Sequence, residues 1–357
     1  MLFYFLIFFT LTLISLSSDY IIPTKKINDL LLYFIIIFFI FMVGFRDDVG
    51  GDWGRYKFYY DNELNPDNIF NLKELFRGGH DAGYEFLQLV FLNLNLEFHF
   101  ITLVIAFIYI CAIANIAKKN DYQIFTFLIA FPFLIIVVGM GYHRQAAAFG
   151  FIIFALDQLN KNKSINFFIL IFLAVLFHKS ALIFIFFILI NIKNKIIIFL
   201  FFLTLSIFIY NYLYTDISRL FDLYLGKFQH LESGGADIRY IFNFIPAIIF
   251  LCYSDILSNN RVEKRIYIIK SVVILLFLPV LFYSSTTADR MLVYFSTIQL
   301  LVYPRINRIF NDNKFSIVYT KYIHIFIIIC YFVFLYTWFA YSSFKDIWIP
   351  YQFFYLK

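Results

Sequence analysis

Residues 165–192 read INFFILIFLAVLFHKSALIFIFFILINI, and this stretch decides how the chain folds. It holds two apolar runs, 165–177 and 180–192, on either side of His178-Lys179. A helix needs about 20 apolar residues to cross the hydrocarbon core of a bilayer, so each run is short for a span. The stretch is therefore one long helix with His178 near its centre, or two short helices. Broken helices are tolerated in membranes where they line a cavity.

The rest of the chain is as apolar as this stretch. Of 357 residues, 62% are hydrophobic and 15% are charged, whereas soluble domains carry roughly 25% charged residues. The other candidate spans are 1–17, 30–45, 99–117, 122–140, 143–158, 196–214, 238–254, 266–284, 290–304 and 322–342. The first is read as a retained span, because no Lys or Arg precedes its apolar core. The sequence predicts an all-α, polytopic transmembrane protein of about 11–13 spans with short broken helices, a single membrane domain over residues 1–357.

Basic residues between the apolar runs orient the chain, because short loops rich in Lys and Arg stay in the cytoplasm. If residues 165–192 are split at His178 and residues 85–98 form an interfacial or re-entrant segment, every basic loop falls on one side. These loops contain Lys25-Lys26, Lys118-Lys119, Lys161 and Lys163, Lys193 and Lys195, Arg261-Lys264-Arg265, and Arg305-Arg308-Lys314. A single helix through 165–192 would move the Lys193 loop to the other side, so we favour the split. The longest polar loops, 46–84 and 215–237, then face outside.

The sequence lacks the features that are typical of several functional classes. The net charge of +6 comes from the loop clusters, so it indicates membrane anchoring and no nucleic-acid partner. Cys111, Cys252 and Cys330 lie alone inside apolar runs, which predicts neither a disulfide nor a metal site. The double glycine Gly50-Gly51 fits a tight turn and lacks the helix and Lys-Ser/Thr of a phosphate-binding loop. We expect no nucleotide, metal or other cofactor.

Ionisable residues near a bilayer are costly unless they are paired, hydrated or functional, and here they gather in a few places. On the favoured topology these places all lie at the outer face. They are residues 45–56, Gly83-Tyr84-Glu85, residues 141–145, residues 177–180, residues 237–240, and Asp289-Arg290 with Tyr294. Four of the sites carry an arginine: Arg46, Arg144, Arg239 and Arg290. The planar fork of arginine donors suits two-point contact with phosphate.

Simpler explanations exist for each of these residues. An arginine at the end of a span could be an anchor that reaches the lipid headgroups. Such anchors favour the cytoplasmic face, which makes this explanation weaker for all four together. His178 could be a packed histidine, and Asp52 and Glu85 could be solvated loop carboxylates. We expect Asp47 and Asp48 to be solvated.

In this order the motifs resemble the EpsG-like, Wzy-type polysaccharide polymerases of bacterial envelopes. The matching pieces run through most of the chain: Phe45-Arg46, Val49-Gly50, Asp52 followed by Tyr56, Gly83-Tyr84-Glu85, Arg144-Gln145, Phe177-His178-Lys179-Ser180-Ala181-Leu182, and Arg290 with Tyr294. The resemblance implies polymerisation of polyprenyl-diphosphate-linked oligosaccharide repeat units into O-antigen, capsule or exopolysaccharide. It also implies a bacterial cytoplasmic membrane protein whose active face points to the periplasm or the cell exterior.

The implied reaction assigns a role to each candidate residue. An acceptor sugar hydroxyl would attack the anomeric carbon of the donor, and polyprenyl diphosphate would leave. Charge growing on the diphosphate would be stabilised by Arg46, Arg144, Arg239 and Arg290. The hydroxyl proton would pass to His178, Asp52 or Glu85, three candidates that the sequence does not rank. Tyr56, Gln145 and Tyr294 would contact the substrate, without a metal.

Two other functions compete with polymerisation. A lipid-linked glycan flippase would place charges along a central cavity and show related halves, neither of which the sequence suggests. An O-antigen ligase would use nearly the same arginines, and only its acceptor would differ. The expected partners are the lipid-linked glycan donor and acceptor, membrane lipid and a chain-length regulator protein.

Overall fold

The chain reverses at His178 in the computed structural model, which describes residues 1–20, 25–71, 81–192, 196, 203, 232–310 and 316–356. Helix α9 (Ser164–Phe177) ends where His178 takes an extended conformation (φ −159°, ψ 117°), and the 3₁₀ helix η3 (Lys179–Ile190) follows. Helices α9 and η3 pack against each other. The Asn191 side-chain amide donates to the Leu159 carbonyl at 3.1 Å, next to the start of α9. The predicted split into two short helices is confirmed.

The apolar runs before this hairpin form helices close to the predicted bounds, and two further short helices lie within the polar loop 46–84. In chain order they are α1 (Leu2–Tyr20), α2 (Lys25–Gly44), α3 (Trp53–Asn62), η1 (Pro66–Phe70), α5 (Ala82–Asn93), α6 (Phe98–Ala117), α7 (Gln123–Ala130), the π-helix η2 (Phe131–Gly139) and α8 (His143–Asn160). Helix α5 covers most of the segment that the sequence predicts to be interfacial or re-entrant. Side chains of η2 are all buried, so this helix lies in the core.

The C-terminal part of the described chain is also helical. It contains α12 (Ala236–Cys252), α13 (Ser254–Leu257), α14 (Arg261–Leu276), α15 (Leu278–Tyr283), α16 (Ser285–Leu292), η5 (Val293–Phe295), α17 (Thr297–Val302), η6 (Tyr303–Phe310), α18 (Ser316–Tyr341), η7 (Lys345–Ile347) and η8 (Phe354–Leu356). The expected span 290–304 is helical and consists of consecutive short segments: the end of α16, η5, α17 and the start of η6. Among the described residues the sole strand-like feature is a bridge between Arg46 and Phe353.

These helices make an all-α, polytopic membrane protein, as the sequence predicts. Four of the described helices are long and apolar enough to cross a bilayer: Lys25–Gly44, Phe98–Ala117, Arg261–Tyr283 and Ile317–Tyr341. Four shorter apolar helices accompany them: Leu2–Ser18, Gln123–Gly139, Ser164–Phe177 and Lys179–Ile190. The expected span 196–214, apart from two isolated residues, and most of the expected loop 215–237 lie outside the described residues, as do Lys193, Lys195 and 72–80. The total of about 11–13 spans stays a prediction.

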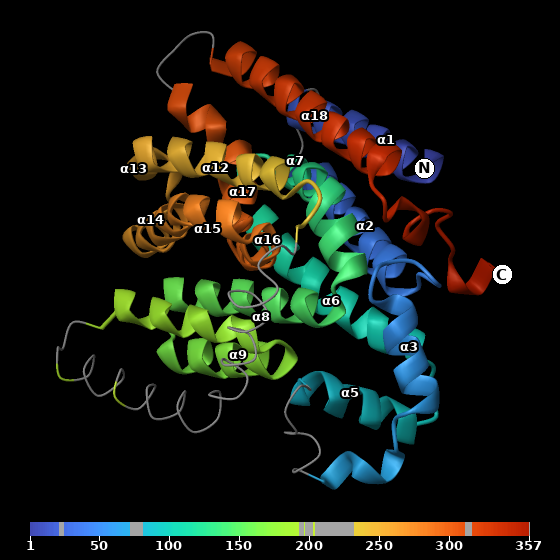
Figure 1. Ribbon diagram of the computed structural model, residues 1–357. Helices are drawn as coiled ribbons and strands as arrows, with labels where there is room; N and C mark the ends of the chain where they lie inside the picture. The colour runs from blue at the N-terminus through green and yellow to red at the C-terminus, as the bar shows by residue number, and fades with distance from the viewer. Residues whose placement is uncertain are drawn as a thin grey trace.

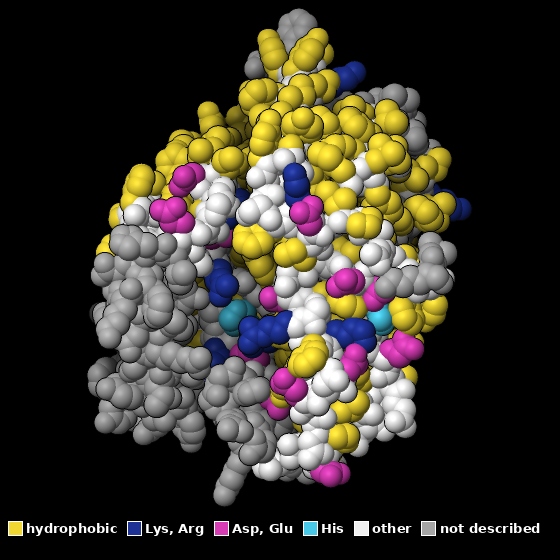
Figure 2. Space-filling model, turned by 45° about the vertical axis from the view of Figure 1, so that its right-hand side comes forward, with side chains coloured by type: hydrophobic (Ala, Val, Ile, Leu, Met, Phe, Trp, Pro, Cys, Tyr) yellow, Lys and Arg dark blue, Asp and Glu magenta, His cyan; other side chains and the backbone are white. Residues whose placement is uncertain are grey.

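The two ends of the chain pack together along one side of the molecule. Helices α1 and α18 lie next to each other in Figure 1, and the rings of Tyr4 and Phe339 stack with centroids 4.8 Å apart. Both helices expose large apolar side chains on their other face, such as Leu2 (71% exposed) and Phe326 (67%). Exposed apolar surface of this extent is expected of a lipid-facing helix. In Figure 2 hydrophobic side chains dominate the upper part of the molecule.

Three of the predicted basic loops meet at one end of the helices. Lys119, just after α6, forms an ion pair with Asp157 near the end of α8. Arg305 pairs with Glu263 in the first turn of α14 at 3.0 Å, and its Nε donates to the Asn120 side chain at 2.8 Å. The opposite ends of α6 and α8 carry His99 and Arg144. The helices therefore separate a basic end from the end that carries the candidate site.

Candidate functional site

The loop after α2 is held in place by a buried arginine. Arg46 is 1% exposed, and its guanidinium donates to the carbonyl oxygens of Val49 at 2.9 Å and Met140 at 2.7 Å. It also contacts the His143 imidazole. Gly50 follows with φ +106°, and a Cβ there would lie 2.1 Å from the Met140 carbonyl oxygen. Only glycine fits this close approach, so the predicted tight turn is confirmed.

This turn sets the position of α3, which presents Tyr56 to Arg144 at the start of α8. Arg144 Nε donates to the Tyr56 hydroxyl at 2.6 Å, and Nη1 donates to the Asp81 carboxylate at 2.7 Å. Arg144 is about one-third exposed (34%), whereas Asp81 is buried. The Asp81 carboxylate also accepts a hydrogen bond from the backbone N–H of Lys179, beside the helix break. One guanidinium thus links α3, α8 and the turn at His178.

A second set of contacts ties the His178 turn to α16 and the residues that follow it. The Gln145 side-chain amide donates to the Arg290 carbonyl oxygen at 2.7 Å. The hydroxyls of Ser180 and Tyr294 are 2.9 Å apart, and the Gln145 side chain also hydrogen-bonds to Tyr294. These contacts fix the backbone of Arg290 and leave its side chain on the surface.

Arg144 and Arg290 both influence the pKa values of two groups, His178 and Asp52. Burial, together with the charges of both arginines, lowers the pKa of His178, in the turn between α9 and η3, to about 4. Burial raises the pKa of Asp52, and the same two arginines and Arg55 partly oppose this rise. The Tyr56 side chain also hydrogen-bonds to Asp52. The structure therefore brings four predicted residues, Asp52, Arg144, His178 and Arg290, into one electrostatic neighbourhood.

The remaining predicted residues lie around this group. Arg239 on α12 is buried and forms a two-point ion pair with Asp289 at 2.6 and 3.0 Å. Tyr142 lies within electrostatic range of both Arg239 and Arg290. Glu85 on α5 is 8% exposed and accepts a hydrogen bond of 3.4 Å from the Tyr59 hydroxyl. Arg239 is thus paired with Asp289, and Glu85 contacts Tyr59.

Charged side chains and histidines gather on one face of the molecule (Figure 2). Figure 2 shows Lys and Arg, Asp and Glu, and His side chains gathered in the middle of the face that carries α3. This band lies below the hydrophobic upper part of the molecule. A lipid with a charged head and a long apolar tail requires such a boundary between cations and apolar surface.

Sequence reasoning missed two carboxylates. Asp81 binds Arg144 from a position 63 residues earlier, and no local pattern distinguishes it from the other acids of its loop. Asp47 was expected to be solvated, and this is wrong, because it is 6% exposed and lies 3.1 Å from His99 Nε2. The C-terminal segment buries this pair: the Asp47 N–H donates to the Gln352 carbonyl at 3.0 Å, and the Phe354 ring stacks on His99.

The part of the chain that the structure describes contains no group of three or more His, Cys, Asp or Glu side chains that could hold a metal. The three cysteines are separate free thiols. The site is therefore built from arginines, single carboxylates, hydroxyls and an imidazole.

Fold and site together define a polytopic helical membrane protein with an arginine-rich polar site at one end of its helices. The model of the EpsG family matches residues 29–353, nearly the whole chain, so the chain belongs to the EpsG family. This confirms the resemblance seen in the sequence motifs. The family includes Wzy-like polymerases, which supports a polysaccharide-related, polymerase-like role at a membrane. A search of curated proteins and a search of solved structures found no match.

Proposed function

We propose that the chain is a membrane glycosyltransferase that polymerises polyprenyl-diphosphate-linked oligosaccharide repeat units. The observation that carries the proposal is the convergence of Arg144 and Arg290 on Asp52 and His178. Membership of the EpsG family supports the reaction class. The products would be O-antigen, capsule or exopolysaccharide, made at the outer face of the bacterial cytoplasmic membrane.

The donor's diphosphate would bind between Arg144, which is partly exposed, and Arg290, which is exposed. Within the described residues, the bonds from the Arg144 side chain to other side chains use Nε and Nη1, so Nη2 can reach a phosphate oxygen. The Arg290 backbone is fixed by Gln145 while its side chain reaches the surface. Preorganised cations at the point where charge develops are the usual means of stabilising a leaving group. The apolar helices beside the site would take the polyprenyl tail.

The bond change follows from this placement. The acceptor hydroxyl oxygen forms a bond to the anomeric carbon, the bond from that carbon to the diphosphate oxygen breaks, and the diphosphate leaves with the electron pair. Asp52 is the favoured acceptor for the hydroxyl proton, because burial raises the pKa of its carboxyl and makes it a stronger base. Burial and two cations weaken His178 as a base, and Glu85 contacts Tyr59.

The other predicted residues act on the geometry of the site. Arg46 is committed to backbone carbonyls and to His143, so we assign it to positioning the loop that carries Asp52. Tyr56 holds Arg144, and Gln145 with Tyr294 holds the Arg290 segment. Arg239 would bind a substrate phosphate by exchanging Asp289 for a phosphate oxygen.

A deletion strain tests this function against its rivals. Without the protein, surface glycan should shrink to single repeat units that are still attached to their anchor. Complete loss of surface glycan would instead indicate a flippase, and free polymer without attachment would indicate a ligase. Complementation with Arg261→Lys, a change at an exposed arginine of the basic end, should restore long chains and serves as the control for arginine substitutions at the site.

A further inference from the structure

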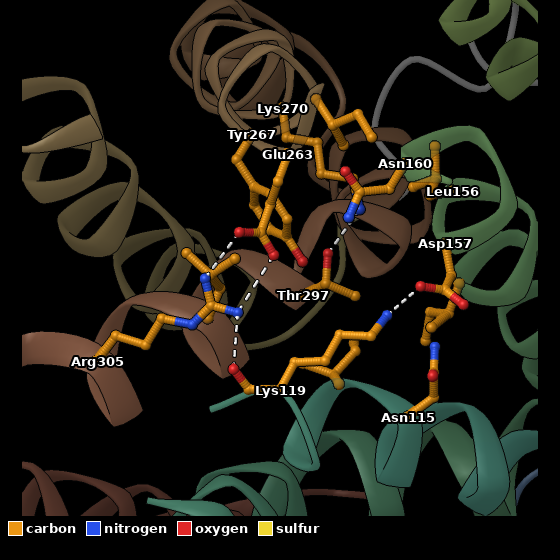
Figure 3. A pocket seen from close by; sticks show the side chains of 14 residues that line it. Asn115, Lys119, Leu156, Asp157, Asn160, Glu263, Tyr267, Lys270, Thr297 and Arg305 are labelled. Carbon is orange, nitrogen blue, oxygen red and sulfur yellow. Dashed lines mark hydrogen bonds and ion pairs between the residues drawn. The ribbon is translucent and has the colours of Figure 1, made fainter. Parts of the chain in front are cut away.

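A pocket lies at the basic end of the helices, far along α6 and α8 from Arg144. It opens between α6 and α8 on one side and α14 and α17 on the other (Figure 3). Its lining includes the side chains of Asn115, Asp157, Asn160, Glu263, Lys270 and Thr297. The cavity of ≈ 50 Å³ has room for three to five waters at about 10–15 Å³ each. It fits a small ion and excludes a sugar repeat unit.

Both carboxylates of the pocket are already neutralised. Asp157 forms ion pairs with Lys119 and Lys161, the latter at 2.7 Å. Glu263 accepts two hydrogen bonds from the Arg305 guanidinium, at 3.0 and 3.2 Å, and Figure 3 shows this fork. Neither acid is therefore available to balance a further cation.

That further cation is Lys270. It lies within the candidate span Arg261–Tyr283 and is 1% exposed. Its ammonium donates to the Thr297 hydroxyl at 2.6 Å and lies 5.3 Å from the centre of the Tyr267 ring. Among the described residues no carboxylate lies within ion-pair distance of it. A buried cation with no anion is strongly unfavourable, so such a residue in a membrane segment points to a bound partner.

Two more polar atoms of the pocket wall are unsatisfied. The Asn115 side-chain nitrogen and the Asn160 side-chain oxygen are buried, and neither has a hydrogen-bond partner in the described part of the chain. Buried polar atoms are rarely left in this state. Together with Lys270 they offer donors for anionic oxygens and one acceptor for a hydroxyl. A hydrogenphosphate group presents this combination, with charged oxygens and a single P–OH.

We propose that this pocket binds a phosphate-type oxyanion, either free phosphate or the phosphate of a lipid headgroup. The anion would pair with the Lys270 ammonium and accept from Asn115, while Asn160 would accept from its hydroxyl. Because these residues come from α14, α6 and α8, the anion would tie these helices together. The proposal does not rest on the glycosyltransferase function, since the pocket lies at the other end of the helices from Arg144.

Equilibrium dialysis of the purified full-length protein against radiolabelled inorganic phosphate tests the site. We expect saturable retention of one phosphate per chain, and a rise in the unfolding temperature of about 5 °C at saturation over chloride of equal ionic strength. Lys270→Met should lower retention at least tenfold. The control is Lys264→Met. Lys264 is a partly exposed lysine on the same helix and pairs with Asp255, so this variant should retain phosphate like the wild type.

A second arm separates the two sources of the anion. If phosphate alone raises the unfolding temperature, the ligand is the free ion, and if only a short-chain prenyl monophosphate does so, it is a lipid headgroup. Either result supports the site when Lys270→Met abolishes it. Should Lys270→Met fail to fold, Asn115→Leu keeps the charge and should still weaken retention severalfold. The proposal would be overturned if neither phosphate nor the prenyl monophosphate affected the wild type, or if Lys270→Met and Asn115→Leu responded to the effective ligand as the wild type does.

Discussion

Arg144, at the start of α8, and Arg305, on η6 at the basic end of the molecule, use their guanidinium groups differently. Arg305 is 1% exposed and is saturated by Glu263, Asn120 and the carbonyls of Leu257 and Lys119. Arg144 is about one-third exposed (34%) and has one carboxylate and one hydroxyl as partners. The number of protein partners therefore separates an arginine that holds the fold together from one that can take a substrate.

The largest effect on activity is expected for Arg144, at the end of the helices that carries the candidate site. Arg144→Lys keeps the charge and loses the two-point geometry, so polymerisation should fall by about 10²–10³-fold. The unfolding temperature should stay close to that of the wild type, because the side chain is partly exposed. Chain elongation in membrane vesicles from the complemented deletion strain measures the first quantity, with Arg261→Lys as the control. A rate within twofold of the wild type would remove Arg144 from the diphosphate site.

At the basic end, substitution of Arg305 should change the stability of the protein. Arg305→Met leaves the Glu263 carboxylate buried without its partner, which should destabilise the protein by about 3–5 kcal/mol. Adding Glu263→Gln removes the uncompensated charge and should recover part of this loss. Thermal unfolding in detergent measures both variants. If Arg305→Met unfolds like the wild type and instead abolishes elongation, the contrast between the two arginines is wrong.

A smaller loss of stability is expected at the turn that carries Asp52. Gly50→Ala would place a Cβ 2.1 Å from the Met140 carbonyl oxygen at a φ of +106°, so it should cost about 1–3 kcal/mol. Gly54→Ala, on the neighbouring helix α3 with open space around it, should be neutral or stabilising by up to about 1 kcal/mol. Equal unfolding temperatures for the two variants would show that the turn is not constrained as described.

The smallest effect concerns pH. Asp52 accepts a proton only in its charged form, so elongation should fall as pH drops through its pKa. Because burial raises this pKa, the fall should begin at a higher pH than for an ordinary aspartate. Arg290 favours the charged carboxylate, so Arg290→Gln should raise the pKa further and move the acidic limb to higher pH. A limb that does not move would assign the proton to another group.

The sequence predicts the helices well because the period and length of apolar runs determine them locally. The split at His178 followed from the spacing of basic loops, and the His178 backbone is extended as that split requires. The division of 290–304 into short α- and 3₁₀-helical segments was not predicted, since apolar composition does not report the type of helix.

Within the site, the sequence could name Arg144 and Asp52 but not their partners. Asp81 reaches Arg144 across 63 residues, and the burial of Asp47 depends on the C-terminal segment that folds over it. Such pairs depend on tertiary packing, which no motif of one segment encodes. The same holds for Lys270, a lysine within an apolar run, because its pocket is lined by helices from distant parts of the sequence.

The most direct test reconstitutes the purified protein in liposomes with one synthetic lipid-diphosphate-linked repeat unit. A polymerase should give a ladder of products with two or more repeats, and one prenyl diphosphate should be released for each linkage formed. The ladder should be lost with Arg144→Lys combined with Arg290→Lys and kept with Arg261→Lys. A ladder of wild-type length from the double variant, or no ladder from the folded wild-type protein, would contradict the claim that these two arginines serve a polymerase.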